Sequence, residues 1–287
     1  MVTVRPFNMN NTMKLSLFIF VILLSGCRSL TTLYFHPSTT YFNDPKNFGI
    51  TYEEITLETK DGYTLANWVF LPEGEVKGRV VFFHGNAENI STHFGSVRWL
   101  PKAGYEVLLV DYRGFGKSTG VPMLPDVISD MQLSYDWMRS RSETDGKPVY
   151  VLGQSIGASL SVIAIAGFDV QPSCVVLDAG FASFKDMARI SFQRSWLFWS
   201  FAYPASWLLP DEFEPMDYAS RITSPVLQLH SPIDPVVPFA QGQKLNGFLP
   251  QARWLETGGP HIATFNKKEY REEVLSFWQE GCQITES

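Results

Sequence analysis

The chain has 287 residues, of which 45% are hydrophobic and 18% charged, so it can bury one large core. Its formal net charge is −6 and it contains no long run of lysine and arginine, which excludes the basic face that nucleic acids require. A nucleic-acid partner is therefore not expected.

Residues 1–26 are predicted to be an export signal. Basic residues precede an apolar run at 15–24, which is half as long as the roughly 20 residues that a membrane-spanning helix needs. The run ends in Leu24-Ser25-Gly26-Cys27, which resembles the lipobox of bacterial lipoproteins, where the cysteine receives the lipid and becomes the new N-terminus. Because Arg28 and not aspartate follows, the resemblance implies an outer-membrane anchor facing the periplasm of a Gram-negative cell. An ordinary signal peptide is the alternative.

Residues 27–48 have no regular pattern and are predicted to be a tether between the lipid and a domain at 49–282. The domain begins with a predicted hairpin, in which alternating stretches at 51–57 and 64–71 flank the turn Asp61-Gly62.

Strand-like and helix-like stretches then alternate along the chain. Strands are predicted at 79–83, 106–110, 149–152, 174–177, 226–229 and 253–255, and helices at 91–103, 125–141, 156–166, 240–248 and 266–279. Such alternation predicts an α/β fold with a mostly parallel, twisted sheet and helices on both faces. The loops at the carboxyl ends of the strands are then expected to carry the functional residues.

One interval, residues 181–217, interrupts the alternation and is rich in phenylalanine and tryptophan. We predict that it forms a small helical cap inserted over the edge of the sheet. Most of its aromatic side chains are expected on the inner faces of the cap helices. A sharper hypothesis is that some of them line a pocket for an acyl chain or reach into a bilayer.

The sequence Gly153-Gln154-Ser155-Ile156-Gly157 stands between a predicted strand and a predicted helix. In this setting it is typical of a nucleophile elbow, where a strained serine leaves a strand and enters a helix, so that glycines are needed on both sides. The first N–H groups of a helix have no acceptor within it, and that of Ile156 can stabilise an oxyanion. The alternative is a buried structural serine.

A second match to the same pattern surrounds Ser118, but no helix begins behind it, because prolines follow at 122 and 125. The same segment imitates a phosphate loop, yet Asp111 occupies the position of that motif's first glycine. Neither a second nucleophile nor a nucleotide site is predicted there. The cysteine and histidine residues also do not have the spacing that is typical of metal ligands, and no cofactor is expected.

A serine nucleophile needs a base, and the base needs an acid that fixes its tautomer. Asp234 lies on the loop after the strand at 226–229, and His261 ends the Gly258-Gly259-Pro260-His261 loop before the last helix. We predict that Ser155, Asp234 and His261 form a catalytic triad. Asp178, at the end of another strand, is the rival acid.

The loop at 84–89 follows the strand at 79–83 and is predicted to supply the second oxyanion donor. Gly85 permits a close approach, so the backbone N–H of Asn86 is expected to act together with that of Ile156. Three other histidines are predicted to have no catalytic role: His84, His93 and His230.

Two cysteines remain, Cys174 in an apolar strand-like run and Cys282 near the end of the chain. The sequence leaves a disulfide between them open and favours Cys174 as a small core residue.

Together these segments resemble the α/β-hydrolase superfamily. The matching segments are HGNAEN at 84–89, DYRGFGKSTG at 111–120, GQSIG at 153–157, SPIDPVVP at 231–238 and GGPH at 258–261, all within residues 50–280. The resemblance is to the abhydrolase or serine aminopeptidase-like branch, which includes eukaryotic protein depalmitoylases. It implies a metal-free acyl hydrolase with the triad Ser155, Asp234 and His261. One departure is Pro232, where many relatives carry a smaller or more polar residue.

The sequence therefore predicts a lipid-anchored serine hydrolase of the cell envelope that cleaves carboxylic esters or thioesters of a small-molecule or acylated substrate. A serine peptidase of the same fold is one alternative. The other is a non-catalytic envelope lipoprotein that uses the fold for binding.

Overall fold

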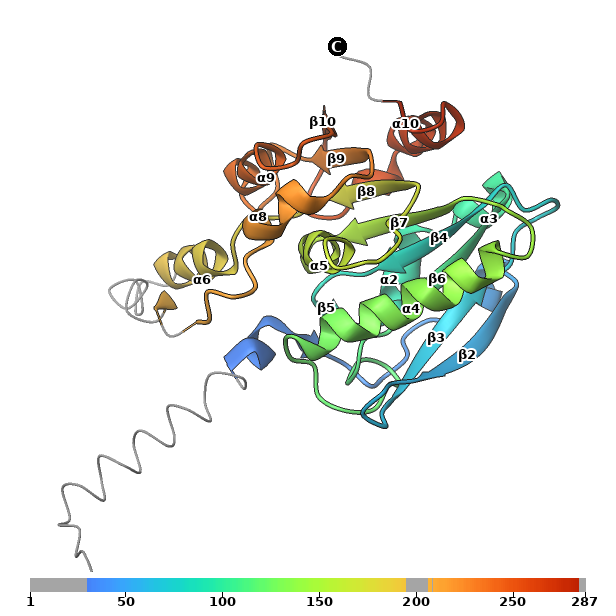
Figure 1. Ribbon diagram of the computed structural model, residues 1–287, viewed down its shortest axis with the longest axis horizontal. Coiled ribbons are helices and arrows are strands. Elements are labelled where there is room, and N and C mark those ends of the chain that lie inside the picture. The colour runs from blue at the N-terminus through green and yellow to red at the C-terminus, as the bar shows by residue number, and fades with distance from the viewer. Residues whose placement is uncertain (1–29, 195–205, 208, 284–287) are drawn as a thin grey trace, which may run out of the picture.

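The computed structural model of the chain describes residues 30–194, 206, 207 and 209–283 (Figure 1). Cys27, the predicted export signal and the middle of the predicted cap therefore lie outside the described residues. No helix within the described ranges is both long enough and apolar enough to cross a membrane.

An eight-stranded sheet forms the centre of the domain, with the strand order β10-β9-β8-β7-β4-β6-β3-β2. All neighbouring pairs are parallel except β2 with β3 and β3 with β6. The strands are β2 (Tyr52–Glu58), β3 (Thr64–Phe70), β4 (Gly78–Phe83), β6 (Tyr105–Val110), β7 (Val149–Gln154), β8 (Cys174–Asp178), β9 (Val226–His230) and β10 (Ala252–Glu256). The mostly parallel sheet that the alternation predicts is thus confirmed.

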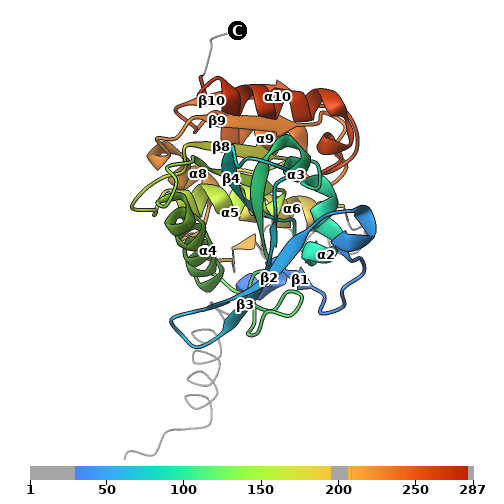
Figure 2. The ribbon, with the colours of Figure 1, turned by 90° about the vertical axis from the view of Figure 1, so that its right-hand side faces the viewer.

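Helices cover both faces of the sheet, and Figure 2 shows α4 to one side of the strands and α3 to the other. Buried side chains of α4 and α5 share one hydrophobic core with the sheet, and those of α3 and α10 share a second core on the opposite face. The helices are α2 (Ile90–His93), α3 (Leu100–Ala103), α4 (Asp126–Ser142), α5 (Ile156–Ile165), α6 (Phe184–Gln193), α8 (Pro215–Tyr218), α9 (Phe239–Asn246) and α10 (Lys268–Gln279).

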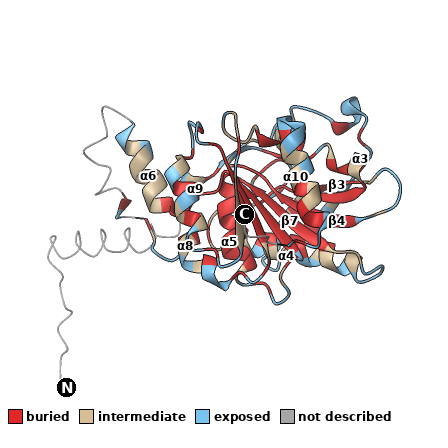
Figure 3. Cartoon of the chain, turned by 90° about the horizontal axis from the view of Figure 1, so that it is seen from above, coloured by how far each residue is buried: buried red, intermediate tan, exposed pale blue. Residues whose placement is uncertain are grey.

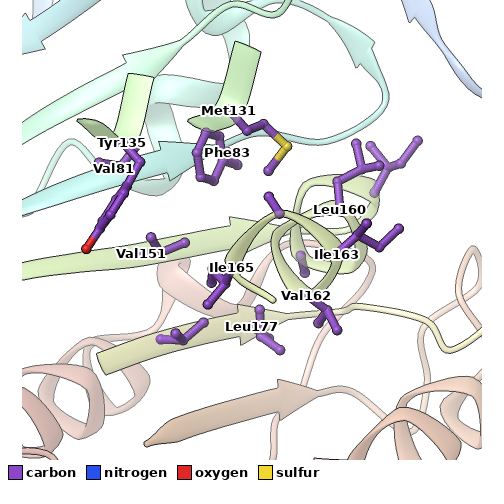
Figure 4. Packing of buried hydrophobic residues seen from close by; sticks show 14 of the residues in the cluster. Val81, Phe83, Met131, Tyr135, Val151, Leu160, Val162, Ile163, Ile165 and Leu177 are labelled. Carbon is purple, nitrogen blue, oxygen red and sulfur yellow. The ribbon is translucent and has the colours of Figure 1, made fainter. Parts of the chain in front are cut away.

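Every residue of α5 is buried, and Figure 3 shows that burial is concentrated in this helix and in the central strands. Figure 4 shows Leu160 and Ile165 of α5 among Val151 of β7, Leu177 of β8 and Met131 of α4. A helix that is apolar on all sides belongs in a core. Its burial holds the turn that joins β7 to α5 in place.

The single helix predicted at 91–103 is wrong. The chain instead forms α2, a 3₁₀ turn at Phe94–Ser96 and α3. Gly95 weakens a helix interior, and Pro101 lacks the N–H that a continuous helix would use, so it stands in the first turn of α3. The result is a compact run of short turns behind the loop at 84–89.

Residues 30–48 do not form the irregular tether that the sequence predicts. They begin with a 3₁₀ turn at Leu30–Tyr34, and the short strand β1 (His36–Pro37) then pairs in parallel with β5 (Ala87–Glu88). Phe35 is buried against Phe115, with ring centroids 6.3 Å apart. Its burial draws this segment onto the domain.

Cys174 of β8 and Cys282, which follows α10, form a disulfide with their Cα atoms 6.1 Å apart. The preference for Cys174 as an unpaired core residue is therefore wrong, although its side chain is fully buried. The bond joins the C-terminal helix to the middle of the sheet.

Candidate active site

Ser155 occupies a strained turn between β7 and α5. Its backbone has φ 55° and ψ −122°, in a region that residues other than glycine rarely adopt. A Cβ atom on Gly157 would lie 2.2 Å from the carbonyl oxygen of Phe83, and one on Gly153 would lie 2.7 Å from the Cα of Ala158. Both glycines are therefore required for the tight approach of strand and helix around the serine.

Ser155, His261 and Asp234 form one chain of hydrogen bonds. The Nε2 atom of His261 lies 2.9 Å from Ser155 Oγ, and its Nδ1 atom lies 2.7 Å from Asp234 Oδ2. A carboxylate can only accept, so Nδ1 carries the proton and Nε2 is free to accept from the serine hydroxyl. The structure thus brings these three side chains together, although Ser155 and His261 are 106 residues apart in the sequence.

The carboxylate of Asp234 is held in its charged form. Burial opposes that form, but hydrogen bonds from His261 and from the backbone N–H groups of Val236 and Val237 outweigh it and hold the pKa of Asp234 below its usual value. A charged acceptor at this position fixes the imidazole tautomer and stabilises positive charge on the ring.

Asp178, the rival acid, makes other contacts. Its two carboxylate oxygens accept hydrogen bonds from Gln154 Nε2 and Thr264 Oγ1, each at 2.8 Å. Its backbone carbonyl accepts the N–H of Ser155. Burial raises the pKa of Asp178 to about 6. Asp178 therefore links the residues around the serine to the histidine loop, while Asp234 holds the imidazole itself.

The other polar residues considered from sequence have structural contacts. Ser118 Oγ donates to the carbonyl of Asp111 and accepts the N–H of Ala66. The fully buried ring of His230 donates from Nε2 to the carbonyl of Val237. The Nε2 atom of His230 also lies 4.0 Å from Asp234 Oδ2, which is too far for a hydrogen bond.

The loop after β4 lies beside the serine. A Cβ atom placed on Gly85 would be 3.7 Å from Ser155 Cβ, and Asn86 and Ile156 line the same cavity as Ser155. His84 is fully buried and donates from Nδ1 to the carbonyl of Gly85, with its Nε2 atom 3.3 Å from Asp111 Oδ1. The ring thus supports the shape of the loop.

A cavity of about 810 Å³ opens above the triad. Most of its described lining residues are apolar, and they include side chains from residues 33–34, from α6 and from the loop after β9. The described lining residues are Leu33, Tyr34, His36, Gly85, Asn86, Ala87, His93, Ser155, Ile156, Phe181, Phe184, Met187, Ala188, Ser191, Phe192, Arg194, Leu209, Val236, Val237, His261 and Ile262. A site of this kind binds a mainly apolar ligand.

Sequence reasoning missed two contributions to this cavity. His93 was predicted only as a helix residue, yet it lines the cavity, its Nε2 donates to the carbonyl of Ala87, and burial lowers its pKa to about 3. Leu33, Tyr34 and His36 come from the predicted tether. The aromatic residues within that otherwise polar stretch are the one signal that could have revealed its packing.

Residues 74–212 match the protein family described as serine aminopeptidase, S33. The chain is also similar to the uncharacterized protein YfhR of Escherichia coli strain K12, with 30% identity over 252 residues that cover 83% of this chain and 85% of YfhR. It is 28% identical over 214 residues to the alpha/beta hydrolase domain-containing protein WAV2 of Arabidopsis thaliana, covering 70% of this chain and 68% of WAV2.

A solved structure with a similar fold is also found. The Pyrococcus furiosus esterase Pf2001 superposes with a TM-score of 0.70 and 21% identity, covering 87% of this chain and 98% of that chain. The α/β-hydrolase fold that the sequence motifs imply is confirmed.

Proposed function

The chain belongs to the serine aminopeptidase S33 family of α/β-hydrolases, and from that premise we propose that it is a serine hydrolase of carboxylic esters or thioesters. The observation that carries this proposal is the hydrogen-bonded chain of Ser155, His261 and Asp234 beneath a mainly apolar cavity. A binding protein would not need a strained serine held against a base and an acid.

The geometry suits acyl transfer through an acyl-serine intermediate. Ser155 Oγ forms a bond to the acyl carbon while its proton passes to Nε2 of His261. The bond to the leaving oxygen or sulfur then breaks as His261 returns that proton to the leaving atom. Water enters next, and its oxygen bonds to the acyl carbon while one of its protons passes to His261. The bond from that carbon to Ser155 Oγ then breaks as His261 returns the proton to Oγ, which releases the acid and the free serine.

The negative charge that develops on the acyl oxygen needs donors fixed in advance. We assign that role to the backbone N–H groups of Asn86 and Ile156. Ile156 is the first residue of α5, so its N–H has no acceptor within the helix. Each such donor contributes roughly 3 kcal/mol to transition-state stability.

The lining of the cavity favours an acyl chain over a peptide amine. Phe181, Phe184 and Met187 present apolar surface, and Arg194 contributes a positive charge that would repel an α-ammonium group. A serine peptidase, which the family description suggests, is the second candidate. If the protein hydrolyses an aminoacyl anilide faster than the matched ester or thioester, the peptidase assignment is favoured.

Labelling with a serine-directed fluorophosphonate tests the proposal. We expect the wild type to be labelled and Ser155→Ala to be unlabelled, with its ester hydrolysis reduced by about 10⁴-fold or more. Ser191→Ala is a matched control, because Ser191 lines the same cavity and its hydroxyl donates to the carbonyl of Met187. Equal labelling of Ser155→Ala and wild type, or no labelling of either, contradicts a catalytic serine.

We also propose that Cys27 carries a lipid that anchors the enzyme to the outer membrane. The Cys174–Cys282 disulfide supports export, because such bonds persist in oxidising compartments. Cys27→Ser is expected to abolish incorporation of radiolabelled palmitate and to release the protein from the membrane fraction. Unchanged palmitate incorporation in this variant overturns the assignment.

A further inference from the structure

The N-terminal segment, defined here as residues 30–40, lies directly against the loop after β4. The N–H of His36 donates to the carbonyl of Asn86 at 3.1 Å, and the N–H of Ser38 donates to the carbonyl of Glu88 at 3.0 Å. These bonds hold the peptide group that precedes Ala87 and the one that follows Glu88. The segment thus contacts the residue whose N–H is assigned to the oxyanion, although it lies outside the family match at 74–212.

Side chains from the domain hold the same segment in place. The buried Nδ2 of Asn89 donates to the carbonyls of Ser38 and Thr40, each at 2.8 Å, while its Oδ1 accepts the N–H of Ser91. Thr31 Oγ1 accepts the N–H of Leu124 at 3.0 Å. With contacts at both of its ends, the N-terminal segment is a fixed wall of the cavity.

Tyr34 is the large side chain that this segment contributes to the cavity. Its ring stacks on Phe184 of α6, with the centroids 4.4 Å apart and the planes at 21°. Phe184 in turn meets the ring of Phe181 edge to face at 4.9 Å. All three side chains line the cavity above Ser155. Together they form a continuous aromatic wall, built from two segments that are far apart in the sequence.

Glu214 acts both on Tyr34 and on the start of α6. Burial raises the pKa of the Tyr34 hydroxyl well above its usual value, and the negative charge of Glu214 adds to this effect, so the ring stays neutral. Glu214 also accepts the backbone N–H groups of Phe184 and Lys185 at the start of α6. The stacked partner of Tyr34 is therefore fixed as well.

We propose that Tyr34 is a specificity-determining residue, whose ring, stacked on Phe184, limits the length of the acyl chain that the cavity accepts. The inference rests on the proposed function and names its substrate class as esters or thioesters of straight-chain acyl groups. Each methylene that finds room in an apolar cavity favours binding by about fourfold. A chain that meets the aromatic wall gains nothing from further methylenes.

Hydrolysis of p-nitrophenyl esters from four to sixteen carbons tests the assignment. In the wild type, kcat/KM is expected to rise with chain length and then level off or fall. Tyr34→Ala removes the ring, so the ratio of kcat/KM for the longest ester to that for the shortest is expected to rise at least fourfold. Tyr34→Phe keeps the stacked ring and is expected to retain the wild-type ratio.

Phe42→Ala is the matched control, because Phe42 follows the segment, is 53% exposed and is not among the described lining residues. A Tyr34→Ala ratio that stays within twofold of the wild-type ratio, or falls below it, overturns the proposal. If Tyr34→Ala does not fold, Tyr34→Trp replaces it: the bulkier ring must shift the preference to shorter esters, and an unchanged profile overturns the proposal.

The same measurements separate this inference from the proposed function. A wild type that hydrolyses none of the esters and takes up no fluorophosphonate contradicts the function itself. An active wild type whose chain-length profile is shared by Tyr34→Ala contradicts only the role of Tyr34.

Discussion

The hydroxyl of Thr264 donates a 2.8 Å hydrogen bond to the buried carboxylate of Asp178. Burial raises the pKa of that carboxyl to about 6, whereas an unfolded aspartate has a pKa near 3.8. Between these values the folded protein keeps a proton that the unfolded chain has lost. The free energy of unfolding therefore falls as the pH rises through this window, by at most about 3 kcal/mol from this group.

Asp178→Asn is expected to remove that pH dependence. The Oε1 atom of Gln154 has no hydrogen-bond partner in the described structure, so its amide can turn and accept from the new side chain. As the pH rises from 4 to 7.5, the unfolding free energy of the wild type is expected to fall by up to about 3 kcal/mol relative to that of the variant. Urea unfolding at several pH values measures this difference, and a constant difference would rule out a buried titrating carboxyl.

Asp234→Asn tests which acid serves the histidine. Because Asp234 accepts from Nδ1 of His261, we expect kcat for ester hydrolysis to fall by about 10⁴-fold with an unchanged fold. Asp178→Asn alters hydrogen bonds to Gln154 and Thr264 only, so its kcat is expected to stay within roughly tenfold of wild type. The reverse order of effects would assign the acid role to Asp178.

Gly157→Ala tests the tight approach around the elbow. Its Cβ would lie 2.2 and 2.4 Å from the carbonyl oxygens of Phe83 and His84, and backbone atoms cannot rotate away. We expect a loss of about 3 kcal/mol in unfolding free energy and, since the loop after β4 must move, about a 100-fold fall in kcat. Gly167→Ala is the control, because its nearest neighbour lies 3.5 Å away. Similar losses in both variants would contradict this account.

Loss of the disulfide is expected to destabilise the whole domain. The bond closes a loop of 108 residues, so Cys282→Ala is expected to lower the unfolding free energy by about 2–4 kcal/mol. Urea unfolding with and without dithiothreitol measures the effect. The reductant should bring wild type to the level of the variant and leave the variant unchanged. Wild type that is insensitive to complete reduction would show that the bond carries no stability.

The sequence predicts those parts of the fold and site that depend on local pattern. The central parallel strands are short apolar runs, and Ser155 and Asp234 follow the ends of two of them, while His261 follows the short edge strand β10. Chain order and the geometry of a parallel sheet are therefore enough to expect them at one edge. The rival Asp178 also ends a strand, and only its contacts with Gln154 and Thr264 distinguish it from Asp234.

The parts that could not be predicted depend on contacts between distant segments. Tyr34 belongs to a segment without periodicity, and its partner Phe184 lies on α6, which the sequence cannot relate to it. The pairing of β1 with β5 involves only two residues of each strand, too few for an alternating pattern. The N-terminal segment therefore looked like a tether.

The disulfide encloses two of the three hydrogen-bonded residues of the candidate site. The covalent ring between Cys174 and Cys282 includes Asp234 and His261 but not Ser155. If a protease cuts the backbone within residues 181–217, Ser155 and its two hydrogen-bonded partners end up on different fragments. The bond between β8 and the end of α10 still joins those fragments, so a nicked molecule keeps its complete triad as one covalent unit.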